Sequence, residues 1–92
     1  METTQQREQR HDEGRQGREK LNTLIGGGVI RALGKPEGLY GVQVWPLWPG
    51  FFRVNVLVGK DASSVEIPYS YFVEADGDGN ILSAAPEITK RY

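Results

Sequence analysis

The segment FRVNVLV, Phe52–Val58, decides the fold because its side chains alternate in kind along the chain. Its even-numbered positions all carry aromatic or β-branched residues. A period of two with such residues is typical of a β-strand that buries one face. The same alternation occurs before it in Tyr40–Trp45 and after it in Val65–Glu74. We therefore predict three strands.

Short connections join these strands, so we expect antiparallel neighbours. Turn residues fill WPLWPGF, which we interpret as a loop from Trp45 to Phe52 that holds both tryptophans, and GKDASS, residues 59–64. DGDGN, Asp76–Asn80, marks another turn, after which Ile81–Ala84 can return as a short fourth strand. Pro68 has no amide hydrogen to donate, which indicates an edge position or a bulge in the third strand.

A helix is predicted before the strands. Apolar residues recur there at three- and four-residue spacing, and the pattern ends at Gly34 and Pro36, where a helix stops. Gly26–Gly28 either break this helix or let its backbone lie close to a sheet. The residues expected to meet in the core are Leu21, Leu24, Ile25, Val29 and Leu33 of the helix and Val42, Val44, Val54, Val56, Ile67 and Tyr69 of the sheet.

The predicted fold class is thus α+β, with one N-terminal helix packed on a three- to four-stranded antiparallel sheet in β-meander order. Residues 21–92 form this single small domain. Residues 1–20 carry no apolar residue after Met1, so we expect a disordered polar arm, in which His11 is a surface residue.

Composition narrows the function classes. The net charge of −1 provides no strong field for nucleic acid or acidic lipid. The absence of cysteine excludes disulfides, thiolate metal sites and thiol nucleophiles. No apolar run is long enough to span a membrane, and residues 2–20 lack the apolar stretch of a secretory signal, so we expect a cytoplasmic protein.

Large aromatic residues gather on the sheet face turned away from the helix. A single helix covers one face only, and the other carries Trp45, Phe51, Leu57 and Phe72 around Arg53. Large aromatics with interspersed polar groups are typical of an interface, so we expect a homodimer or a protein partner there, with Trp48 of the proline-rich loop taking part. Two alternatives are a single-stranded nucleic-acid-binding module that stacks bases on these rings and simple packing beneath the arm.

Catalysis and metal binding find little support in the sequence. His11 is the only histidine, and no serine has an identifiable base and orienting acid, so we predict a non-enzymatic domain with no catalytic residue and no cofactor. Asp76, Asp78, Asn80 and Glu87 match the spacing of an EF-hand calcium loop, but Ile81 stands where that loop requires glycine. A hairpin turn is the simpler interpretation, and no metal is predicted.

The order of helix, hairpin and a strand reading YFVEADGDGNIL weakly resembles the PepSY family. Tyr71, Val73, Asp76, Gly79 and Leu82 carry the resemblance, and Asp78-Gly79 stands where that family tends to have Thr-Gly. The resemblance to this family implies an inhibitory or interaction role. The expected function is therefore a small interaction or regulatory domain that self-associates through the aromatic face of its sheet, with the nucleic-acid-binding and PepSY-like domains as alternatives.

Overall fold

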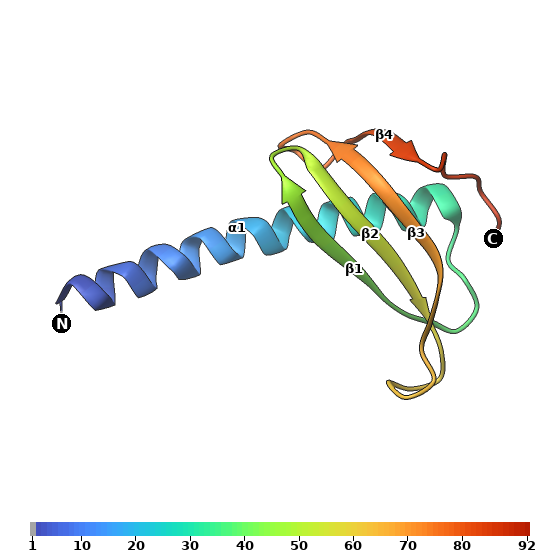
Figure 1. Cartoon of the computed structure of the whole chain (residues 1–92), viewed down its shortest axis with the longest axis horizontal. Coiled ribbons are helices and arrows are strands. Elements are labelled where there is room, and N and C mark those ends of the chain that lie inside the picture. Colours follow the sequence, from blue (N-terminus) through green and yellow to red (C-terminus); the bar gives the residue numbers. More distant parts are fainter. Residues whose placement is uncertain (1) are drawn as a thin grey trace.

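One long helix and four strands make up the computed structural model, which describes the backbone of residues 2–92 and the side chains of residues 17–92 (Figure 1). The strands form one open antiparallel sheet in the order β1-β2-β3-β4, so the predicted α+β meander is confirmed. The predicted short fourth strand is present. The elements are α1 (Glu2–Leu33), β1 (Leu39–Trp48), β2 (Phe51–Val58), β3 (Glu66–Ala75) and β4 (Ile81–Ala85).

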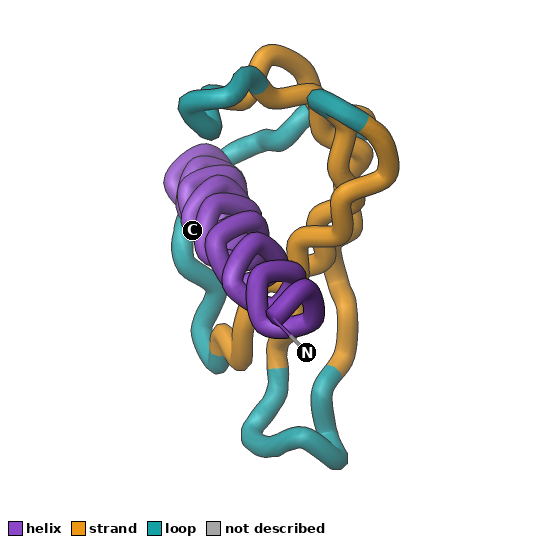
Figure 2. The backbone as a smooth tube through the Cα atoms, turned by 90° about the vertical axis from the view of Figure 1, so that its left-hand side faces the viewer, coloured by secondary structure: helices purple, strands orange, loops and turns teal. Residues whose placement is uncertain are grey.

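The helix lies on one side of the sheet (Figure 2). It begins at Glu2, so the backbone of the predicted arm is helical, and this end of α1 projects beyond the sheet (Figure 1). The disorder of residues 1–20 and the domain boundary after them stay predictions. His11 lies outside the residues whose side chains are described.

The core forms where the helix crosses the sheet. Ile25, Val29 and Leu33 of α1 are fully buried, as the four-residue spacing predicts. The buried sheet residues are Phe52, Val54, Val56, Tyr71, Val73 and Ala75, with Leu21, Val42, Val44 and Tyr69 partly buried against them.

Two residues predicted for the core are exposed instead. Leu24 is 42% exposed because it lies beside the Ile25–Leu33 stripe, next to the turn at Gly79. Ile67 is 53% exposed because the register shift of β3 against β2 between Val56 and Val58 interrupts the alternation that predicted a core position for it. Both core predictions were wrong because a repeat along the chain shows neither a bulge in a strand nor how far the partner element reaches.

The segment Trp45–Phe52 is not a loop, which corrects the prediction. β1 continues to Trp48, and only Pro49 and Gly50 connect it to β2, with Gly50 at a φ of 83° that favours glycine. β1 is an edge strand, so the missing amide hydrogen of Pro46 does not interrupt the sheet. Both tryptophans therefore stand on a strand rather than on a free loop.

Pro68 occupies the kind of position that its chemistry predicts. The pairing of β2 with β3 shifts register between Val56 and Val58, opposite this part of β3. β4 pairs with β3 only from Phe72 onward, so Pro68 also lies on an edge segment. The expectation of an edge or a bulge is confirmed on both counts.

The three glycines do not break the helix. A Cβ on Gly26 would come within 3.3 Å of a Val42 methyl group, and one on Gly28 within 3.1 Å of the Ile81 Cδ1. Gly27 points to open space. Two of the glycines therefore allow a close approach of helix to sheet, which is the second of the two predicted interpretations.

Candidate functional site

The open face of the sheet carries the predicted partner-binding residues. Strand pairing aligns Trp45, Arg53 and Phe72 in one row across β1, β2 and β3. The next row toward the Pro49-Gly50 turn contains Trp48, Phe51 and Glu74. This is the face turned away from the helix, because the alternate positions Phe52, Val54 and Val73 belong to the core.

Three rings on this face contact one another. The ring centroids are 5.6 Å apart for Trp48 and Phe51, 5.9 Å for Trp48 and Phe72, and 5.6 Å for Phe51 and Phe72. These separations lie within the range in which aromatic pairs attract beyond simple burial. We call Trp48, Phe51 and Phe72 the aromatic cluster; the register of three strands and a two-residue turn holds its rings in place.

The tryptophans remain largely open to solvent. Trp45 and Trp48 are each 55% exposed, whereas Phe51 and Phe72 are half-buried. Leu47, at the same end of β1, is 42% exposed. Exposure of several large apolar side chains at one end of a sheet is a feature that interaction surfaces often have.

One predicted member lies apart from the others. Leu57 is half-buried and shares the face by strand alternation, but the row of Gln43, Asn55 and Ser70 separates it from Trp45 and Phe72. Ser70 Oγ donates a hydrogen bond of 2.6 Å to Asn55 Oδ1 within that row. The expectation that Leu57 lies near the aromatic rings is wrong, because two residues four positions apart on a strand are more than 12 Å distant.

One charge of each sign lies beside the aromatic cluster. Arg53 is exposed and pairs in register with Phe72, while Glu74 pairs with Phe51. Ser83 Oγ donates a hydrogen bond of 3.4 Å to Glu74 Oε1, which orients this carboxylate from β4. The two charges occupy diagonal positions on neighbouring strands, so the surface offers a cation and an anion at its border.

The acidic turn between β3 and β4 is closed by its own hydrogen bonds. Asp76 Oδ1 accepts bonds of 2.9 Å from the backbone N–H groups of Asp78 and Asn80, and Oδ2 accepts one of 3.1 Å from the Asn80 side chain. The Asn80 side chain and backbone, followed by the Asp78 and Gly79 amides, lower the pKa of the Asp76 carboxyl. This geometry is that of an Asx-type hairpin turn.

Within residues 17–92, no group of three or more His, Asp or Glu side chains is placed to hold a metal ion. No described portion of α1 is both long and apolar enough to cross a membrane. The absence of catalysis, of cofactors and of metals, and the cytoplasmic location, stay predictions.

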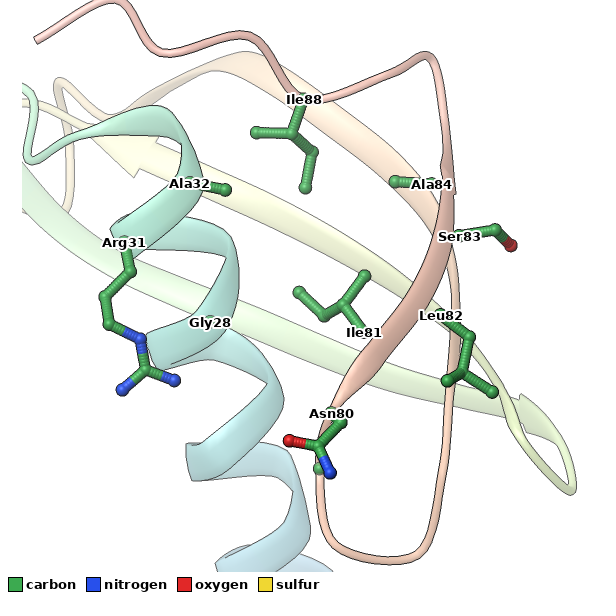
Figure 3. A pocket seen from close by; sticks show the side chains of 10 residues that line it. Gly28, Arg31, Ala32, Asn80, Ile81, Leu82, Ser83, Ala84 and Ile88 are labelled. Carbon is green, nitrogen blue, oxygen red and sulfur yellow. The ribbon is translucent and has the colours of Figure 1, made fainter.

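The sequence did not predict a groove between α1 and β4. It has a volume of about 520 Å³ and is lined in part by Gly28, Arg31, Ile81 and Ile88 (Figure 3). Gly28 was the available signal, since a glycine inside an apolar helical stripe indicates a close neighbour. The neighbour itself, Ile81, could not be named without the fold.

Comparison of the chain with protein-family models, with curated proteins and with solved structures finds no match. The resemblance to the PepSY family therefore stays a prediction.

Proposed function

We propose that this chain is a small non-enzymatic interaction domain that self-associates through the open face of its sheet. The observation that carries the proposal is the aromatic cluster of Trp48, Phe51 and Phe72, extended by the exposed Trp45. Tryptophan and tyrosine are enriched among the residues that contribute most binding energy in interfaces. A preformed cluster also reduces the entropy lost when its side chains are ordered on binding.

A second copy of the chain is the partner that fits this surface best. In a two-fold dimer the same patch is used twice, so a surface must be complementary to itself. The aromatic rings satisfy this condition by stacking on their counterparts. Arg53 and Glu74 satisfy it as well, because a two-fold axis between them brings the cation of one copy toward the anion of the other.

Sedimentation equilibrium over a range of micromolar concentrations tests the proposal. We expect the natural chain to be a dimer at about 10 μM and Trp48→Glu or Phe72→Glu to raise the dissociation constant by at least about 30-fold, the effect of losing roughly 2 kcal/mol at a central interface residue. Leu24→Glu is the matched control. It places the same charge at another exposed apolar residue, 42% exposed, on α1, which lies on the other side of the sheet (Figure 2), so it should leave the dimer intact.

Charge reversal tests the arrangement of the dimer separately. Arg53→Glu and Glu74→Arg should each weaken association, and the double variant should restore it, because the pair then has opposite signs again. A natural chain that remains monomeric at 100 μM or above would refute self-association.

The nucleic-acid alternative has a distinct outcome in the same series. Salt-dependent binding of a single-stranded oligonucleotide that Arg53→Glu abolishes would favour it over the dimer. The surface itself favours the dimer, because Arg53 is accompanied by Glu74 rather than by further cations. A phosphate backbone would meet repulsion where a second copy meets attraction.

A further inference from the structure

The groove between α1 and β4 is an open hollow with the volume of a ligand site. Its volume of about 520 Å³ lies within the range of roughly 300–1,000 Å³ typical of small-molecule pockets. One wall is the last part of α1 and the other is β4. Figure 3 shows Ile81 and Ala84 pointing toward the helix and Ile88, from the segment after β4, pointing into the space between them.

The absence of a side chain at Gly28 opens this groove. A Cβ at this position would lie 3.1 Å from the Cδ1 of Ile81 and 3.9 Å from a guanidinium nitrogen of Arg31. The apolar wall and the cation thus approach the same point above the helix backbone. A larger residue at position 28 would fill the space that separates them.

Arg31 is the one charged residue in the lining, all of which belongs to the described part of the chain. Its guanidinium makes no hydrogen bond or ion pair within residues 17–92. The polar side chains across the groove are already engaged, since Asn80 donates to Asp76 and Ser83 donates to Glu74. Arg31 is therefore the cation available to a ligand in this lining.

We propose that this groove binds an aliphatic carboxylate of the fatty-acid type. The alkyl chain lies against Ile81, Ala84 and Ile88, and the carboxylate pairs with Arg31. A guanidinium matches a carboxylate in a two-point hydrogen-bonded geometry. A single cation suits a singly charged head group rather than a phosphate. The groove lies between α1 and β4, whereas the aromatic cluster lies on the open face of β1, β2 and β3, so this proposal does not depend on self-association.

Titration of the ¹⁵N-labelled full chain with decanoate, followed by two-dimensional NMR, tests the proposal. We expect saturable shifts at the amides of Gly28, Arg31, Ile81 and Ile88, with a Kd on the order of 0.1 mM for a ligand of this size. Decyltrimethylammonium has the same chain and the opposite charge, and acetate has the charge without the chain. Both should bind at least about tenfold more weakly, because each lacks one of the two recognised features.

Substitutions separate the two parts of the site. Arg31→Gln should weaken decanoate binding about tenfold or more, while Arg31→Lys should retain part of it and Lys60→Gln, a matched loss of an exposed cation outside the groove, should change nothing. Ala32→Trp fills the groove from an exposed helix position and should abolish binding without loss of the folded spectrum. Shifts confined to the aromatic cluster, equal affinity for decyltrimethylammonium, or unchanged binding by Arg31→Gln would each overturn the proposal.

Discussion

Replacing Gly27 by alanine is expected to stabilise the protein, whereas the same change at its neighbour Gly26 is not. Both residues lie inside α1, where alanine is favoured over glycine by up to about 1 kcal/mol. Gly27 is exposed, and no atom lies within 4 Å of the position its Cβ would take. The full propensity gain of roughly 0.5–1 kcal/mol should therefore appear in the free energy of unfolding.

Alanine at position 26 gains the same helix propensity, but unfavourable contacts with the sheet offset this gain. Gly26 is buried, and its Cβ would lie 3.3 Å from Val42 Cγ1 and 3.5 Å from Val44 Cγ2. Both neighbours are β-branched and stiff about χ1, so the helix must move away from the sheet instead. Overpacking of this kind costs about 1–3 kcal/mol, which makes Gly26→Ala neutral at best and destabilised by up to roughly 2 kcal/mol.

Urea and thermal unfolding of the natural chain and the two variants, followed by circular dichroism, measure this difference. Gly27→Ala should raise the melting temperature by a few degrees, because about 1 kcal/mol corresponds to roughly 4–8 °C in a domain of this size. Equal stabilisation by the two substitutions would refute the close approach of α1 to β1. Destabilisation by Gly27→Ala would instead show that this part of the chain is not helical.

Three further predictions concern stability. Val56→Ala removes methyl groups from a fully buried position and should lower the free energy of unfolding by about 1–3 kcal/mol in urea titrations; a neutral result would mean that the faces of the sheet are reversed. Gly50→Ala forces a side chain into the φ of 83° at the β1–β2 turn and should cost about 1 kcal/mol by the same measurement, unlike Gly41→Ala on β1, which has open space around it. The pKa of the Asp76 carboxyl is lowered from its usual value of 3.8, so the carboxylate stabilises the fold at pH values above 3.8, and this contribution is lost as the pH falls through the lower pKa of the folded state. Asp76→Asn should therefore reduce the loss of stability on acidification below about pH 4. An unchanged acid profile would contradict this assignment.

The strands could be predicted from the sequence because their signal is local. The alternation in Phe52–Val58 places each side chain on one face of the sheet without reference to any other segment. The Asp76–Asn80 turn likewise indicates the return of the chain that leads to β4. Whether a strand lies at the edge of a sheet depends on segments elsewhere in the chain, and for this reason Pro46 and Pro49 suggested a loop. The chain order alone does not show that β1 is an edge strand where Pro46 is tolerated.

The sequence predicted most residues of the open face, but it did not predict which of them contact one another. The face that carries Trp45, Phe51 and Phe72 follows from alternation, and the contact of Trp48 with two of its rings follows from a hairpin turn shorter than expected. Leu57 was misplaced because distance along a strand was neglected. The groove could not be predicted because it depends on the close approach of Gly28 to Ile81. These residues are 53 positions apart in the chain and meet only when the helix packs on the sheet.

The aromatic cluster lies open because the described chain, residues 2–92, has one helix, which covers one face of its sheet. The polar residues around the cluster limit how far an interface over it can extend. The buried residues of α1 pack against the core on one side of the sheet, so the described part of the helix does not cover the other side. The hydrogen-bonded row through Asn55 and Ser70 then bounds the aromatic region on the side away from the Pro49-Gly50 turn. In the proposed dimer, a second copy would therefore cover the turn end of β1, β2 and β3 and leave the 59–65 connection uncovered. Substitutions such as Lys60→Gln should accordingly leave association unchanged, while those at Trp48 and Phe72 weaken it.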